Sequence, residues 1–188
     1  RHAAVQNFEL RRQLAAGDDY RAVTTKKADS RHPAMVELAA FLRDRYGPFW
    51  RRKIRLLLVT GEPEQAEAIA PGLTGQHWLE GDHTVLIYGG RPSAEPDVAL
   101  LTALKKLRRS RPLDGIIWPL TEEQSRQTAQ LDKGWRELVN GSKRLGFQAP
   151  LYLWQVCDDG DYQTGRPLQS VGCLLPERCT PEQLAVML

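Results

Sequence analysis

Cysteine is scarce in this chain, and the few cysteines present are not arranged for metal or disulfide chemistry. The number of cysteines is odd, and no two of them form a Cys-x-x-Cys pair; they are Cys157, Cys173 and Cys179. The sequence therefore supports neither a zinc ribbon nor a disulfide framework, and this usage fits a reducing compartment. His77 and His83 match neither the HExxH nor the zinc-finger spacing, so we expect no metal site.

Long apolar runs are also missing. No run approaches the roughly 18 residues that suggest a membrane-spanning helix, and no signal peptide is recognisable. The chain has 41% hydrophobic and 26% charged residues, which is ordinary for a soluble globular domain, and its 188 residues suffice for one good core. Because it starts with Arg1 rather than methionine, we expect it to be a piece of a longer protein.

Positive charge is not in large excess overall, but the basic residues are clustered. The net charge of +3 is too small to indicate nucleic-acid binding by itself. The simplest interpretation of the clusters is two solvated helix ends, and the alternatives are a juxtamembrane basic segment or a docking surface. Few aromatic residues lie between the basic ones, so no stacking platform for bases is evident. The two clusters are Arg51, Arg52, Lys53 and Arg55, and Lys105, Lys106, Arg108, Arg109 and Arg111.

The first 50 residues have helical periodicity, which predicts a helical extension ahead of a second domain. The clearest helix starts at Pro33 and ends before Gly47-Pro48, with Met35, Leu38, Ala39 and Leu42 on one face. A weaker helical pattern covers residues 7–16, and residues 20–31 are polar and predict a loop. We therefore divide the chain into residues 1–50 and residues 51–188.

From residue 51 onward, strand and helix patterns alternate. Residues 54–60, 114–120 and 149–158 predict buried strands, residues 75–90 predict a hairpin with its turn at Glu80-Gly81-Asp82, and residues 170–176 are a further strand candidate. Helices are expected from residue 63 to a stop at Pro71-Gly72, over about 96–109, over 122–145 and from Thr180. Their inward residues should be Val98, Leu101, Leu104 and Leu107 in the second helix, and Leu131, Trp135 and Leu138 in the third.

This alternation predicts an α/β fold with a mostly parallel sheet flanked by helices. Ligands of such sheets bind at the carboxyl ends of the strands, which directs attention to residues 60–68, 88–91 and 155–159. Trp118 and Trp154 come at the ends of buried strands. They are core candidates that could instead line a shallow groove.

The stretch LLLVTGEPEQAEAI, residues 56–69, has the layout of a phosphate-binding P-loop without its chemistry. Aligning GxxxxGK[ST] from Gly61 puts Ala66 at the second glycine, Glu67 at the lysine and Ala68 at the hydroxyl. A lysine about 4 Å from a phosphate is worth roughly 4 kcal/mol, so its replacement by glutamate is a swing of up to about 8 kcal/mol. Micromolar nucleotide binding is itself only about 8 kcal/mol, so ordinary nucleotide binding should be abolished.

Three segments together resemble a known family. They are FWRRKIRLLLVTGEP, EGDHTVLIYGGR, and RPLDGIIWPL followed by LGFQAPLYLWQVCDD. In order and spacing, these segments are similar to the cytoplasmic GTPase-like domain of the IcmF/TssM family. Members of that family are inner-membrane components of type VI secretion systems. The resemblance covers about residues 38–160. It implies a P-loop NTPase (small-GTPase-like) fold for residues 51–188.

This chain departs from the family at each nucleotide motif. The D-T-A-G-R segment matches residues 87–91, so Ile87 stands for the metal-linked aspartate. The T-K-x-D segment matches residues 155–158, so Val156 replaces the lysine and only Asp158 is retained. We interpret the chain as a pseudo-NTPase without catalytic residues, cofactor or metal. Its vestigial nucleotide-site positions are Gly61, Ala66, Glu67, Ala68, Ile87, Gly90 and Asp158.

The resemblance implies a scaffold on the cytoplasmic side of the bacterial inner membrane, within a membrane-embedded parent protein. Its expected partners are baseplate proteins of the secretion system and the smaller inner-membrane partner of the same complex. One alternative is an atypical NTPase that holds nucleotide through Asp158 and backbone amides, with Lys53 or Arg91 as the phosphate cation. Another is a binder of nucleic acid or anionic membrane through the basic clusters, although we expect no nucleic acid.

Overall fold

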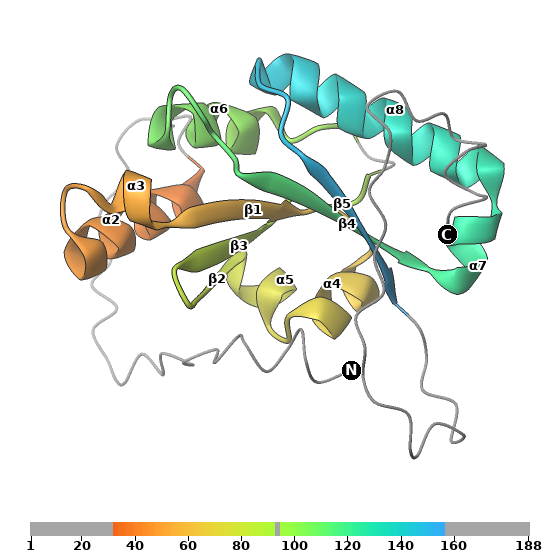
Figure 1. Cartoon of the computed structure of the whole chain (residues 1–188), viewed down its shortest axis with the longest axis horizontal. Helices are drawn as coiled ribbons and strands as arrows, with labels where there is room; N and C mark the ends of the chain where they lie inside the picture. Colours follow the sequence, from red (N-terminus) through yellow and green to blue (C-terminus); the bar gives the residue numbers. More distant parts are fainter. Residues whose placement is uncertain (1–31, 93–94, 157–188) are drawn as a thin grey trace, which may run out of the picture.

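The computed structural model describes residues 32–92 and 95–156. These residues form an α/β fold with one five-stranded sheet between two layers of helices (Figure 1). The strand order is β2-β3-β1-β4-β5, in which β2 is antiparallel to β3 and all other pairs are parallel. The predicted α/β class and mostly parallel sheet are therefore confirmed. The strands are β1 (Arg55–Val59), β2 (Trp78–Gly81), β3 (Thr84–Tyr88), β4 (Gly115–Thr121) and β5 (Leu151–Val156).

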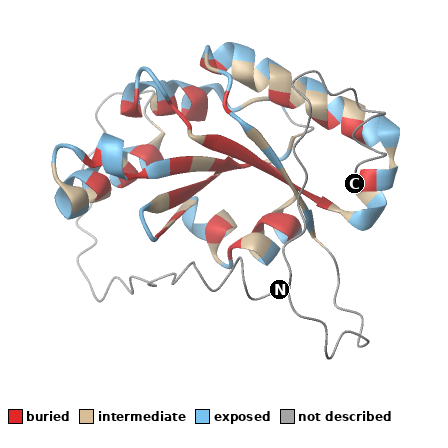
Figure 2. Ribbon diagram, viewed as in Figure 1, coloured by how far each residue is buried: buried red, intermediate tan, exposed pale blue. Residues whose placement is uncertain are grey.

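Helices cover both faces of the sheet. On one face, α2 (Pro33–Tyr46), α6 (Val98–Leu107) and α8 (Thr128–Leu145) pack on strand residues such as Leu56 and Leu58. On the other face, α4 (Pro63–Ile69) and α5 (Leu73–Gln76) pack on Val59 and Leu86. Alternate residues of each strand thus enter opposite layers, which is why the central strands are continuous apolar runs. Figure 2 shows this burial along β1 and β4.

The helix predicted from Pro33 is confirmed as α2, and it belongs to the main core. Leu38 and Leu42 are fully buried in the same cluster as Leu56 and Leu104. The Tyr46 hydroxyl at the end of α2 donates to the Glu80 carboxylate on β2, which joins this helix to the sheet edge. The division of the chain at residue 50 stays a prediction, and the helical pattern at residues 7–16 lies outside the described residues.

Three local predictions are corrected. The sequence predicts a buried strand over residues 149–158, but β5 is only partly covered because it is the edge strand of the described sheet, with β4 on one side. The helical pattern places Val98 inside, but it is exposed, and Leu100 points inward in its place. The hairpin is confirmed, yet its turn is at Asp82 and His83, both with positive φ, which suits a two-residue turn matching the strand twist.

The long helix predicted over 122–145 is divided into α7 (Glu122–Arg126) and α8. Gln127 lies between them with φ −96 and ψ 91, outside the helical region. The direction of α7 is fixed by the end of β4, because Thr121 and Gln124 form a capping box and Ser125 accepts from Gln155 of β5. The direction of α8 follows its own apolar stripe. Buried in that stripe are Leu131, Gly134, Leu138 and Leu145, whereas Trp135 is half-buried.

A buried ion pair joins four elements at the amino end of the sheet. Arg108, just after α6, donates to the Asp114 carboxylate at 2.5 Å and to the backbone carbonyl of Ile54 at 3.2 Å. The same Asp114 oxygen accepts from the backbone N–H of Leu56 at 2.8 Å. Arg108 also donates to the carbonyl of Arg51, in the short helix α3 (Trp50–Lys53). This junction therefore fixes α3, α6, β1 and β4 to one another.

Replacing Asp114 should destabilise the protein strongly. In Asp114→Ala, Arg108 keeps its buried charge without a counterion, and we expect the free energy of unfolding to fall by about 3 kcal/mol. Arg111 donates to the other Asp114 oxygen at 2.9 Å but is mostly exposed, so Arg111→Gln should cost less than about 1 kcal/mol. Urea denaturation of both variants measures the difference. Equal losses in the two variants would contradict the central role of Arg108.

Candidate functional site

The connection from β1 to α4 is too short to form a phosphate cradle at the aligned positions. β1 ends at Val59 and α4 starts at Pro63, so Ala66, Glu67 and Ala68 all lie inside the helix. The backbone N–H groups of Gln65 and Ala66 donate to the carbonyl of Glu62 at 3.1 and 3.0 Å. A P-loop holds phosphate with free N–H groups of this segment, and here those groups serve the first turn of the helix.

Gly61 is a glycine because the backbone passes close to β4. A Cβ at this position would lie 2.5 Å from Cγ of Pro119, which no ordinary contact allows. The N–H of Gly61 donates to the carbonyl of Gly90 at 3.0 Å, and its own carbonyl accepts from the Tyr88 hydroxyl at 3.2 Å. Burial raises the pKa of Tyr88, which keeps this hydroxyl a donor. Gly61 thus joins the ends of β1, β3 and β4.

Glu67, at the position of the phosphate-binding lysine, has a structural partner. Its carboxylate accepts from the backbone N–H of Gly72 at 2.6 Å and from that of Thr74 at 2.8 Å, and also from the Thr74 hydroxyl. The Thr74 hydroxyl and these two N–H groups lower the pKa of Glu67. The carboxylate therefore secures the turn from α4 into α5, which an ammonium group at residue 67 could not do.

The other predicted positions are dispersed. Ile87 is fully buried within β3 and paired with Leu58 and Trp78, so its side chain belongs to the core and not to the loops at the carboxyl end of the sheet. Gly90 has φ 79 and lies beside Gly61, while Asp158 falls outside the described residues. Among the predicted nucleotide-site positions that the structure describes, Gly61 and Gly90 are the only two from different motifs that it brings together, through one backbone hydrogen bond.

The two cations considered for phosphate binding are poorly placed for it. Lys53 ends α3 and precedes β1, so it lies at the amino end of the strand, opposite the loop after Val59. Arg91 does follow β3 at the carboxyl end, but it pairs with Glu62 at 2.9 Å. We therefore correct the assignment of Lys53. An anion at Arg91 would lie beside the carboxylate of Glu62, which repels it.

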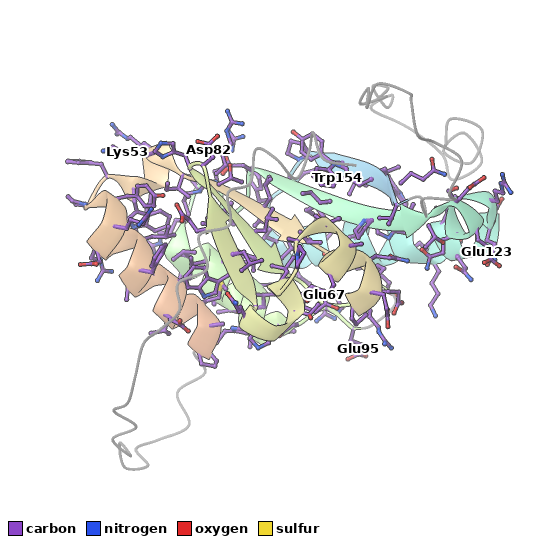
Figure 3. All side chains as sticks on the ribbon, turned by 90° about the horizontal axis from the view of Figure 1, so that it is seen from below. Lys53, Glu67, Asp82, Glu95, Glu123 and Trp154 are labelled. Carbon is purple, nitrogen blue, oxygen red and sulfur yellow. The ribbon has the colours of Figure 1, made fainter. Side chains whose placement is uncertain are left out.

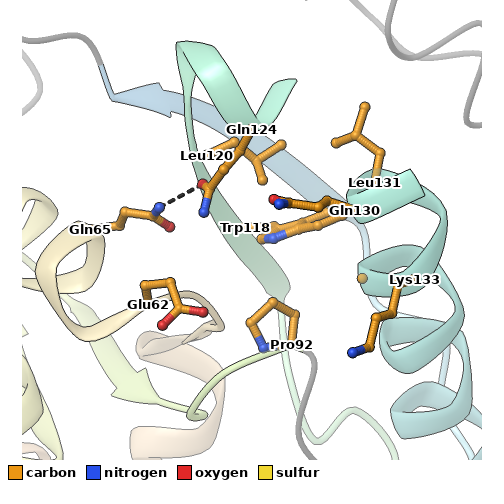
Figure 4. Close-up of a pocket in the computed structure, with 10 residues that line it drawn as sticks. Glu62, Gln65, Pro92, Trp118, Leu120, Gln124, Gln130, Leu131 and Lys133 are labelled. Carbon is orange, nitrogen blue, oxygen red and sulfur yellow. Dashed lines mark hydrogen bonds between the residues drawn. The ribbon is translucent and has the colours of Figure 1, made fainter. Parts of the chain in front are cut away.

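A cleft of about 350 Å³ lies at the carboxyl ends of β1 and β4 (Figure 4). After β1 the chain continues to β3 on one side of it, and it later returns to form β4 on the other side. The carboxyl ends of β1 and β4 are therefore the topological switch point of the sheet, where α/β proteins bind ligands. The cleft is half open and has a largely apolar floor with a polar rim. The floor consists of Pro92, Trp118, Leu120, Leu131 and Gly134, and the rim of Glu62, Gln65, Gln124, Gln130 and Lys133.

Amide groups hold the rim of the cleft in place. Gln65 of α4 donates to the side-chain oxygen of Gln124 at 2.6 Å, and that oxygen also accepts from the backbone N–H of Thr121 at 3.0 Å. The floor depends on Gly134, because a Cβ there would lie 2.3 Å from the Trp118 ring. The surface is therefore preorganised, mostly neutral and suited to a side chain or small group with apolar and amide-binding parts.

Sequence reasoning finds part of this cleft. Trp118 is predicted either in the core or lining a groove, and it is buried and lines the cleft. Trp154 packs instead with the α4 and α5 layer. The sequence patterns miss Gln124, Lys133 and Gly134, although the capping-box pattern Thr-x-x-Gln at residues 121–124 could have located Gln124.

In comparisons with protein-family models, with curated proteins and with solved structures, nothing matches this chain. None of the described helices has the length and hydropathy needed to cross a bilayer. The residues themselves therefore carry the functional argument.

Replacing Glu67 by glutamine should test its role between α4 and α5. A folded-state pKa below the unfolded value, near 4.5, means that the stabilisation is complete above pH 4.5 and lost as the pH falls through the folded value. We expect Glu67→Gln to lose about 1 kcal/mol of unfolding free energy at pH 7, and this deficit to shrink toward pH 3. Urea denaturation at both pH values measures it. The exposed Glu64→Gln in the same helix is the matched control, and a pH-independent deficit would contradict the assignment.

Proposed function

We propose that the chain is a non-catalytic scaffold domain of a type VI secretion membrane-complex protein resembling the IcmF/TssM family. In this proposal its α/β fold is a small-GTPase-like P-loop NTPase fold whose nucleotide chemistry has been replaced by internal contacts. The observation that carries it is the start of α4 at Pro63, which commits the N–H groups of the phosphate loop to a helix. The carboxylate of Glu67 adds repulsion toward any phosphate nearby.

The order of elements supports the family resemblance. The elements follow one another as the family pattern implies. A short basic helix precedes the first strand, and after that strand come a helix, a hairpin leading into residues 88–91, a further helix and two parallel strands. The quoted motif segments fall at the strand ends in this order. This succession of elements is an observation in favour of the proposed resemblance, which covers about residues 38–160.

The cleft is the docking surface that the geometry favours. It occupies the end of the sheet where a nucleotide would lie in a working member, and its apolar floor and amide rim suit side chains of a protein partner. In this proposal the partner is a baseplate protein. The chain then lies on the cytoplasmic side of the inner membrane beside the smaller membrane partner of the complex.

Titration with nucleotide tests the loss of the phosphate site. Calorimetry of the chain with magnesium-GTP and magnesium-ATP should show no binding up to about millimolar, where the free energy would be only about 4 kcal/mol. Glu67→Lys with Ala68→Ser should not restore binding, because both residues lie within α4. Micromolar binding by the unchanged chain would instead favour the atypical NTPase and overturn the scaffold proposal.

Two charge reversals test the docking surface. Lys133→Glu, on the rim of the cleft, should weaken binding to the baseplate proteins at least about tenfold, measured by interferometry with immobilised chain. Lys106→Glu makes the same change of charge at the other end of the molecule and should leave the affinity unchanged. The opposite result would assign baseplate docking to the second basic cluster and exclude the cleft.

A further inference from the structure

The two basic clusters of the sequence, which are about 50 residues apart, meet in the folded chain. Arg51 of the first cluster donates to the carbonyl of Leu107 at 2.8 Å, and Arg108 of the second donates to the carbonyl of Arg51 at 3.3 Å. The end of α8 joins them, because Lys105 donates to the carbonyl of Arg144 at 2.6 Å. The three segments therefore form one continuous surface at the amino ends of β1 and β4.

We call this surface the basic face. Its members are the exposed cations of α3, α6, α8 and the adjoining loops. It lies at the opposite end of the sheet from the cleft, and Figure 3 places Lys53 at one end of the long axis and Glu123 of α7 at the other. The basic face consists of Arg51, Arg52, Lys53, Arg55, Lys105, Lys106, Arg109, Arg111, Lys143 and Arg144.

Within the described residues, few acidic groups offset this charge. Asp114 lies within the face, but its two oxygens are already paired with Arg108 and Arg111. Asp82 lies at the margin of the basic face, in the hairpin turn. The backbone N–H of Arg55 donates to the carbonyl of His83 in the same turn. The remaining cations attract a multivalent anion along the whole surface.

An exposed aromatic residue accompanies the basic face. Phe49 directly precedes α3 and is 68% exposed, although its neighbour Trp50 is buried in the core. A phenylalanine held at the surface beside arginines and lysines is the composition of segments that lie in the membrane interface.

The same features disfavour nucleic acid. α3 has four residues, barely one turn, and is too short to present several side chains along a DNA groove. One exposed phenylalanine provides no series of stacking positions for unpaired bases.

We propose that the basic face binds the anionic phospholipid surface of a membrane, with Phe49 inserted among the headgroups. This would place the amino ends of β1 and β4 against the bilayer. The cleft at the carboxyl ends would then face away from the membrane, open to a second partner. The inference rests on the residues of this chain and holds whether or not the proposed scaffold function is correct.

Co-sedimentation of the full chain with lipid vesicles tests this inference. The chain should sediment with phosphatidylcholine vesicles containing about 30% phosphatidylglycerol and not with pure phosphatidylcholine. Raising the salt from about 0.05 M to about 0.5 M should release it, because the attraction is screened. Equal binding to both vesicles would overturn the proposal.

Matched variants locate the surface. Lys53→Gln, Lys106→Gln and Arg109→Gln together should lower the partition coefficient at least about tenfold. Arg126→Gln, Lys133→Gln and Arg136→Gln remove the same charge from exposed positions on α7 and α8 and should leave it nearly unchanged. Phe49→Ser keeps every charge and should lower it about fivefold. Equal losses in the two triple variants, or tighter binding to duplex DNA than to the anionic vesicles, would contradict the assignment.

Discussion

The contact between Arg108 and Asp114 is the interaction on which the arrangement of this molecule depends. Removed from water, the guanidinium of Arg108 is satisfied by the Asp114 carboxylate and by three backbone carbonyls, those of Arg51, Ile54 and Arg111. A buried cation with this many fixed partners tolerates little displacement of any of them. It aligns the start of β1 with the start of β4, and it draws the two basic clusters onto one surface. The alignment of β1 with β4 and the basic face therefore depend on the same contact.

The carboxyl end of the sheet is governed by a different constraint, the early start of α4. Only residues 60–62 separate the end of β1 at Val59 from the start of α4 at Pro63, which leaves no length of chain for a long anion-binding loop. Glu67 then turns α4 into α5 through the N–H groups of Gly72 and Thr74. Contacts of the fold itself thus occupy the groups that a phosphate would need.

Much of the fold could be predicted from the sequence, because the central strands and α2 have strong apolar patterns. The exposure of β5 could not, since an apolar run does not reveal which strand lies at the edge of a sheet. The break at Gln127 depends on the local capping box at the end of β4 and on the contact between Ser125 of α7 and Gln155 of β5, which lie 30 residues apart in the sequence. At the candidate site, the lack of a lysine and a hydroxyl at the aligned phosphate-loop positions was predictable from the sequence. The cleft was not, because its lining converges from α4, β4, α8 and the loop at Pro92.

The cleft exists because β4 continues past the end of β1, and Pro119 marks the point where the pairing of the two strands stops. In β4 the backbone N–H of Ile116 donates toward β5. Because the backbone groups of successive residues point to opposite sides of a strand, those of Ile117 and Pro119 point toward β1. The carbonyl of Ile117 accepts from the N–H of Thr60, which is the last link between the two strands. Proline has no N–H to continue the ladder, so its position is tolerated only because β1 has ended. β4 therefore runs past β1 with β5 as its only described partner, and the space beside its final residues is the cleft over Trp118.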